Sequence, residues 1–230
     1  MGHKVHPTIH RLPLIYTWDS KWFARKENMP TYLKQEVEIR DYLEKKLKGA
    51  GVDAVGIERG PKELTVNILA AKPGMIIGRS GQDLDVIRKE IEKKILGFKL
   101  KVKLNIVPLK SPALSARVVA LSAAEEIENR MPFRRVMKKV LEKVMAAGAK
   151  GVKIKMAGRL NGVEIARRET LGAGKMSLIT LRSDVDYAMV EAQTLQGKIG
   201  IKVWIYHGEA FGRKDKFEKK EEEKKATAKR

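Results

Sequence analysis

The strongest constraint on the fold of this chain is a Gly-x-x-Gly turn at residues 78–81, placed between two helical patterns. A short apolar segment at 72–77 precedes the turn, and an amphipathic segment at 82–96 follows it. Glycine has no Cβ, so the backbone of such a turn can come close to a nucleic-acid strand. The amide groups at the start of the second helix, with the positive end of its dipole, would then face phosphate groups. The turn therefore predicts a contact with nucleic-acid backbone.

The segments around this turn predict a compact α+β unit. Alternating apolar residues predict strands at 52–59 and 63–70, separated by a Gly-Pro turn, and a third strand at 99–106. A helix is expected at 31–48 because an apolar stripe recurs there at helical spacing. The stripe consists of Leu33, Val37, Ile39, Leu43 and Leu47.

The resulting order is helix, strand, strand, helix, GxxG, helix, strand, and it resembles a type II KH domain. Such a domain holds about four nucleotides of single-stranded RNA across its GxxG loop. We expect the KH domain at residues 31–107, after an extended N-terminal arm at 1–30. The RNA-binding residues expected at its loop are Lys72, Gly78, Arg79, Ser80 and Gly81.

The arm carries three aromatic residues in an otherwise polar segment. Trp18, Trp22 and Phe23 are expected to anchor it, by packing on a core or by contacting an RNA surface. Packing is the favoured interpretation, because isolated aromatic side chains more often fill cores than stack on bases.

The chain is basic along its whole length. Its 230 residues include 48 Lys and Arg against 28 Asp and Glu, a formal net charge of +20. Such a distribution indicates contacts with polyphosphate on several faces. The sequence has no apolar run of ~20 residues, so no membrane partner is expected. It also has no cysteine, which excludes disulfides and thiolate metal sites and fits an intracellular protein.

A second α+β domain is predicted at 113–210, after a proline-containing linker at 108–112. It should consist of two helices packed on a small sheet. From 211 to 230 the chain is almost entirely Lys, Glu and Ala, which predicts a disordered basic tail. The elements expected in the second domain are helices at 113–130, 133–147 and 186–195, and strands at 152–157, 163–170, 178–181 and 199–206.

The helix at 133–147 combines a buried seam with a basic face. Its apolar residues recur at i, i+3, i+4 and i+7, which is typical of one face of a helix packed on a core. Like charges at i, i+4 repel. The four cations on the opposite face indicate either an anionic partner or a merely solvated surface. They are Arg134, Arg135, Lys138 and Lys139.

Along nearly its full length, the chain resembles the family of the third protein of the small ribosomal subunit, in its bacterial or organellar form. Separate motifs carry the resemblance and occur in the family's order. They are Met-Gly-His-Lys-Val-His-Pro at 1–7, Trp-Asp-Ser-Lys-Trp-Phe at 18–23, the basic helix at 133–139, Gly-Arg-Leu-Asn-Gly-Val-Glu-Ile-Ala-Arg at 158–167, and the segments 181–187 and 200–205.

This resemblance implies a structural, non-enzymatic protein that is ribosome-bound in the cytoplasm and needs no cofactor. It implies binding to small-subunit rRNA in the subunit head, among neighbouring head proteins, beside the channel through which mRNA enters. The basic helix would face that channel with the fourth and fifth small-subunit proteins, grip mRNA and contribute to passive unwinding. Further rRNA contacts are expected at Lys4, Arg159, Arg167, Arg168 and Lys175.

Other chemistries find little support in the sequence. The Gly-Ala-Gly-Lys segment at 172–175 fails as a P-loop, because Glu169 stands where Gly is needed and Met176 follows the lysine. His3, His6 and His10 could ligate a metal in principle, but no Cys supports them and no metal site is expected. Two alternatives remain open: a free KH regulator of single-stranded RNA, and a nucleic-acid-processing enzyme, for which no catalytic constellation is recognisable.

Overall fold

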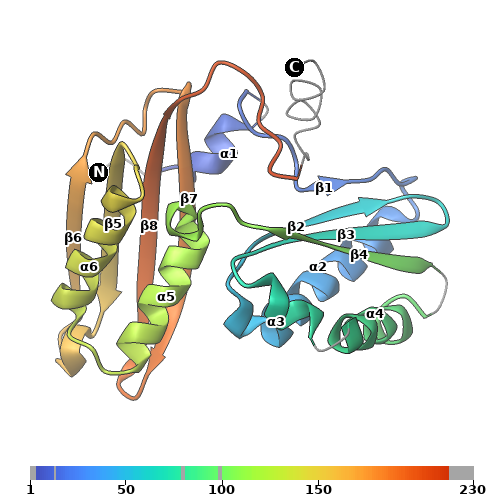
Figure 1. Cartoon of the computed structure of the whole chain (residues 1–230), viewed down its shortest axis with the longest axis horizontal. Helices are drawn as coiled ribbons and strands as arrows, with labels where there is room; N and C mark the ends of the chain where they lie inside the picture. Colours follow the sequence, from blue (N-terminus) through green and yellow to red (C-terminus); the bar gives the residue numbers. More distant parts are fainter. Residues whose placement is uncertain (1–3, 13, 79–80, 98–99, 218–230) are drawn as a thin grey trace, which may run out of the picture.

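The computed structural model describes residues 4–12, 14–78, 81–97 and 100–217. Within these residues the chain forms two α+β halves that lie side by side, each with a four-stranded sheet and helices on one of its faces (Figure 1). No helix among the described residues is both long and apolar enough to cross a membrane.

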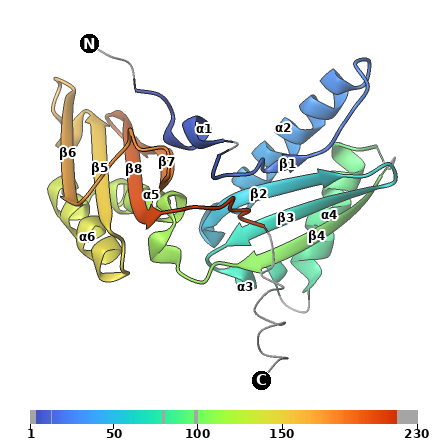
Figure 2. The same cartoon turned by 90° about the horizontal axis from the view of Figure 1, so that it is seen from above.

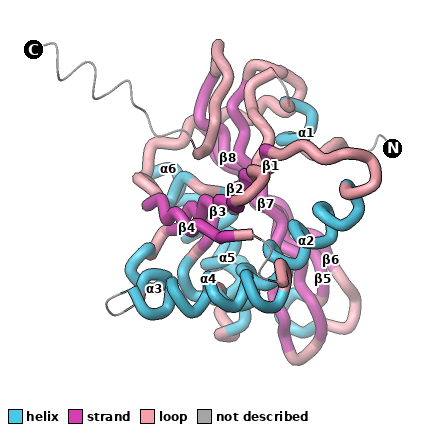
Figure 3. The backbone as a smooth tube through the Cα atoms, turned by 90° about the vertical axis from the view of Figure 1, so that its right-hand side faces the viewer, coloured by secondary structure: helices cyan, strands magenta, loops and turns pink. Residues whose placement is uncertain are grey.

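The N-terminal half has the strand order β1-β2-β3-β4. β2 and β3 are antiparallel, whereas β1 joins β2 and β4 joins β3 in parallel. Seen along the strands, β2, β3 and β4 form a layer above α3 and α4 (Figure 3). The elements are β1 (Ser20–Lys21), α2 (Met29–Lys46), β2 (Val52–Arg59), β3 (Glu63–Ala70), α3 (Pro73–Ile77), α4 (Gln82–Lys94) and β4 (Lys101–Pro108), with a 3-10 turn at Lys48–Ala50. The predicted type II KH order is thereby confirmed.

The core of this half joins α2 and α4 to the inner face of the sheet, with Ile39, Leu43, Val66 and Ile91 all buried. The predicted stripe of α2 is buried only in its second part. Leu33 and Val37 are 54% and 49% exposed, because the first turns of α2 extend past the edge of the sheet (Figure 2).

The N-terminal arm is more structured than the extended segment we expected. It contains the short helix α1 (Pro7–Arg11) and strand β1. Arg11 is fully buried, and its guanidinium donates hydrogen bonds to the carbonyl oxygens of Leu178 (2.9 Å) and Thr180 (3.0 Å). Its Nη1 also donates to the Pro7 carbonyl at 2.9 Å, so both terminal nitrogens of the buried guanidinium have carbonyl acceptors, whereas Nε has none among the described residues. The arm is therefore fastened to the C-terminal half.

The aromatic residues of the arm contribute less to its anchoring than expected. Trp18 is 65% exposed and Phe23 is 91% exposed, so packing on a core is wrong for both. Trp22 is half-buried and its indole N–H donates to Glu36 Oε2 at 2.5 Å.

The C-terminal half has the antiparallel strand order β6-β5-β8-β7, and α5 and α6 cover one face of this sheet (Figure 1). Val136, Met137 and Val144 of α6 pack with Ile154 and Ile201 of the sheet in one buried cluster. This confirms the prediction of two helices on a small sheet. The elements are α5 (Ala116–Glu128), α6 (Phe133–Ala146), β5 (Gly151–Gly158), β6 (Arg167–Gly174), β7 (Ser183–Thr194) and β8 (Gly197–Glu209), with 3-10 turns at Pro112–Leu114 and Leu160–Gly162.

Three predicted elements of this half are wrong. The helix expected at 186–195 is the strand β7, because its residues pair along their whole length with β8 and place Ala188 and Ala192 in the core. The strand expected at 178–181 is a loop, and carbonyl groups of this loop accept hydrogen bonds from the Arg11 guanidinium. The strand expected at 163–170 begins four residues later, after a 3-10 turn in which Asn161 has a φ of 57°.

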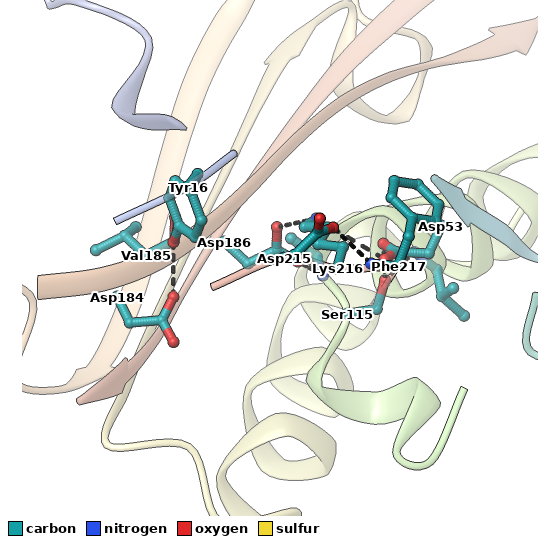
Figure 4. Close-up of polar contacts among 11 residues, drawn as sticks. Tyr16, Asp53, Ser115, Asp184, Val185, Asp186, Asp215, Lys216 and Phe217 are labelled. Carbon is teal, nitrogen blue, oxygen red and sulfur yellow. Dashed lines mark hydrogen bonds and ion pairs between the residues drawn. The ribbon is translucent and has the colours of Figure 1, made fainter. Parts of the chain in front are cut away.

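The segment expected to be disordered from residue 211 is in part attached to the body. Residues 211–217 are described, and the backbone of Lys214 forms an isolated parallel β-bridge with Tyr16 of the arm. The ammonium of Lys216 pairs with Asp186 of β7 at 3.3 Å and with Asp53 of β2 at 3.8 Å (Figure 4). The charged composition predicted a solvated chain, but carboxylates from both halves bind these lysines. Residues 218–230 lie outside the described part.

The start of α5 also connects the two halves. The Ser115 hydroxyl donates to Asp53 Oδ1 at 2.5 Å, and the Ala116 N–H donates to Asp186 Oδ2 at 2.7 Å. Ser115, Asp53, Asp186 and Lys216 thus form one polar network at the junction (Figure 4). This junction positions the GxxG loop and the basic helix α6 on a common frame.

Candidate nucleic-acid interface

The GxxG turn lies between α3 and α4, as predicted. Gly78 has φ 69° and ψ −171°, and Gly81 has φ 80° and ψ 4°, so both adopt conformations that residues with a Cβ rarely reach. Arg79 and Ser80 lie outside the described residues. Lys72 is exposed at the start of α3, and its backbone N–H donates to the Ala50 carbonyl at 3.1 Å. The two glycines therefore flank the turn, and Lys72 lies at the opposite end of α3.

The helix that follows the turn carries acidic residues at its N-terminal end. Asp83 and Asp85 occupy the first turn of α4 and partly neutralise the positive end of its dipole. A phosphate at this turn would need cationic side chains as well as the helix amides. Met75 and Ile77 of α3 are 58% and 41% exposed, and they form an apolar surface beside the turn. Their exposure was not apparent from the sequence, because the same residues could have filled the core as Ile76 does.

The basic face of α6 is exposed, as expected. Arg134, Arg135, Lys138 and Lys139 all point away from the buried seam formed by Val136, Met137, Val140 and Val144. The first turn of α6 contains no acidic residue, so two arginines lie at the positive end of the helix dipole. This placement is unfavourable in isolation and raises the local positive potential.

Acidic residues divide the four cations into two pairs. Arg134 lies 3.5 Å from Glu169 of β6, and Lys139 lies 2.6 Å from Glu126 of α5. Among the described residues, Arg135 and Lys138 have no carboxylate partner. The sequence could not reveal this division, because Glu169 and Glu126 belong to other elements.

The predicted rRNA contacts have different environments. Arg134 and Arg167 come together in a shallow pocket of about 260 Å³, beside the 3-10 turn after β5. Lys4, Arg168 and Lys175 are exposed. The half-buried Arg159 instead donates from Nε to the Val163 carbonyl at 3.0 Å, so it holds its own loop.

The alternative chemistries do not gain a site from the tertiary structure. Gly172 and Gly174 lie within β6, whereas a P-loop would need a turn before a helix. Among the described residues, no group of three or more His, Cys, Asp or Glu side chains is placed to hold a metal ion. His6 caps α1 and packs its ring against Tyr187 at 4.6 Å, and burial lowers its pKa. His3 lies outside the described residues.

Comparisons with known proteins identify the same two halves of the chain. The family model of the KH domain matches residues 38–114, and the model of the C-terminal domain of ribosomal protein S3 matches residues 123–205. The chain is 46% identical to the small ribosomal subunit protein uS3 of Chromobacterium violaceum, over 91% of this chain and 88% of the relative. It is also 46% identical to the uS3 proteins of Ligilactobacillus salivarius, over 92% and 95%, and Desulforudis audaxviator, over 91% and 94%.

Proposed function

This chain belongs to the uS3 family of small ribosomal subunit proteins, and from this premise we propose that it binds rRNA in the subunit head and lines the channel through which mRNA enters. As a member of that family it is a structural, non-enzymatic protein that acts bound to the ribosome in the cytoplasm. The proposal concerns which surfaces contact which RNA.

The mRNA contact is assigned to α6, and the unneutralised pair Arg135 and Lys138 carries the assignment. Both side chains are exposed on a helix that the core of the C-terminal half holds rigidly. Cations on a rigid element bind phosphates without reading bases, as a channel for any mRNA requires. Arg134 and Lys139 add charge at the edges of the same face. The fourth and fifth small-subunit proteins would complete the channel. A channel only wide enough for a single strand would exclude paired RNA.

The rRNA contacts are assigned to the KH loop and to the exposed cations Lys4, Arg167, Arg168 and Lys175. Glycine conformations and Lys72 at the loop allow close approach to an RNA backbone. We do not assign Arg159 a primary rRNA contact, because its guanidinium donates a hydrogen bond to the Val163 carbonyl in the loop that follows β5.

The proposal is tested in ribosomes that carry Arg134→Ala, Arg135→Ala and Lys138→Ala together. We expect slower translation through stable mRNA hairpins and unchanged translation of unstructured mRNA. The matched control removes three exposed lysines from α2, with Lys34, Lys45 and Lys46 changed to Ala. Equal hairpin transit in the test variant and in wild type would overturn the role of α6. Sedimentation away from small subunits at physiological salt would overturn the ribosomal placement itself.

A further inference from the structure

One face of the C-terminal sheet is covered by α5 and α6, but most of the opposite face carries no helix (Figure 2). Side chains alternate along each strand. Val152, Ile154 and Met156 of β5 point into the helix-covered core, so Lys153 and Lys155 lie on the opposite face. We call this the open face.

The strand register places cations next to one another on the open face. Lys155 of β5 stands directly opposite Lys202 of β8, and Thr170 of β6 stands on its other side. Like charges directly opposite each other across two strands are destabilising. Arg168 of β6, opposite Ala157 in the next row, lies on the same face. Lys155 and Lys202 are 47 positions apart in the sequence, so only the sheet brings them together.

Little acidic charge offsets this group. Neither Lys155, Lys202 nor Arg168 pairs with a carboxylate in the part of the chain that the structure describes. Glu191 of β7 lies on the same face, but it pairs with Lys198 at 2.9 Å. Burial, followed by the charges of Lys4 and Lys155, lowers the pKa of Lys153. Lys153 therefore lies near enough to Lys155 and Lys4 to be affected by their charges.

The shape of the open face suits an extended chain. The rows on either side of Lys155 and Lys202 contain the small residues Ala157, Gly172 and Gly200, which extend no long side chain over the face. On β7, beside α1, the ring of Tyr187 is in edge-to-face contact with His6 of the arm, so the arm covers this part of the face. Beside Lys202, the apolar side chain of Met189 is 54% exposed. A protein partner would bury little apolar surface here, and interface cores are depleted of charged residues.

We propose that the open face binds the phosphodiester backbone of rRNA in addition to the GxxG loop, and that Arg168, already assigned to rRNA, belongs to this larger surface. This inference rests on the proposed function, which supplies the rRNA. Phosphates along one strand would relieve the repulsion between Lys155 and Lys202, and Lys153 and Arg168 would extend the contact. Binding would be independent of base sequence, since these side chains face phosphates.

The first test is the salt dependence of binding to rRNA purified from protein-stripped small subunits. In a variant with Lys155→Gln and Lys202→Gln, we expect the slope of log affinity against log salt to fall by about two units. The free protein should keep or raise its melting temperature, since a like-charge pair is removed. The control, Lys34→Gln with Lys45→Gln, loses the same charge from α2 and should keep the slope. An unchanged slope in the test variant would overturn the inference.

The second test locates the partner in assembled subunits. A photo-crosslinking amino acid at Thr170, opposite Lys155, should capture rRNA, and the yield should fall when Lys155 and Lys202 are replaced. Capture of protein alone would overturn the inference while leaving the ribosomal placement intact. Failure of the wild-type chain to sediment with small subunits would instead overturn the proposed function, and the salt slope on purified rRNA would still decide the open face.

Discussion

The ammonium of Lys216 lies 3.8 Å from the carboxylate of Asp53, and this contact ties the C-terminal segment to the KH half. The same ammonium lies 3.3 Å from Asp186 of the other half. Burial raises the pKa of Asp53, and the charge of Lys216 opposes that rise. The charge of Lys216 therefore favours the ionised form of Asp53 at the junction. A segment that looks like a solvated tail thus acts as a clamp between the halves.

Replacing Lys216 by Met should weaken this clamp. The change leaves Asp53 and Asp186, whose side chains are 7% and 16% exposed, without their cation. Because the Lys216 side chain is itself 34% exposed, we expect a loss of about 1–2 kcal/mol in the free energy of unfolding, between values typical of surface and buried pairs. Urea denaturation measures it. Lys34→Met, at an exposed pair on α2, should change stability by less than about 0.5 kcal/mol. Equal losses in the two variants would contradict the clamp.

Replacing Tyr16 by Phe should destabilise the protein in a pH-dependent way. The Tyr16 hydroxyl donates to Asp184 Oδ1 at 2.6 Å, and Lys214 also bonds this carboxylate. Burial by itself would raise the pKa of Asp184, but the hydrogen bonds from Lys214 and Tyr16 outweigh it and hold this pKa below its ordinary value. Loss of the phenol donor should cost about 1–3 kcal/mol at neutral pH.

The sign of the pH effect follows from the lowered pKa of Asp184. Its stabilisation is complete above the pKa of the unfolded state, about 3.9, and is lost as pH falls through the folded-state pKa. The gap between wild type and Tyr16→Phe should therefore narrow as pH is lowered from 7 to 3. Unfolding free energies at both pH values measure it, and a gap that widens towards acid would refute this account of Asp184.

Alanine substitutions should distinguish the two glycines of the KH loop. A Cβ on Gly78 would lie 2.0 Å from Asp83 Oδ2 and 2.8 Å from its Cβ, whereas a Cβ on Gly81 meets nothing within 4 Å. Gly78 also occupies a backbone region that is almost exclusive to glycine, at a cost of about 1–3 kcal/mol for other residues. We expect Gly78→Ala to lower stability and the affinity for single-stranded RNA more than Gly81→Ala does.

Gly74→Ala is the matched control for the loop. Gly74 lies within α3, and a Cβ there meets nothing within 4 Å. Alanine is the better helix former, so this variant should be as stable as wild type or slightly more stable. Thermal melts and binding of a short single-stranded RNA report both properties. Equal behaviour of the Gly74 and Gly78 variants would show that the loop conformation is unimportant.

Strongly local patterns allowed accurate prediction of the KH half. The observed bounds of β2 and β3 coincide with the predicted strands at 52–59 and 63–70, because alternation and the Gly-Pro turn are properties of neighbouring residues. The seam of α6 was equally visible at helical spacing. Prediction failed at 186–195, where Ala, Met, Glu and Gln favour a helix but pairing with β8 imposes a strand. Long-range hydrogen bonds there outweigh local propensity.

By itself, the sequence determined the type II KH order, the second α+β half and the basic face of α6, because each rests on periodicity or on charges close along the chain. Only the tertiary structure decided which of those charges are neutralised and which are not. Glu169 and Glu126 reach Arg134 and Lys139 from other elements, and Lys155 meets Lys202 across two strands. Electrostatic interactions depend on distance in space, and that distance is set by packing between segments that lie far apart in the sequence.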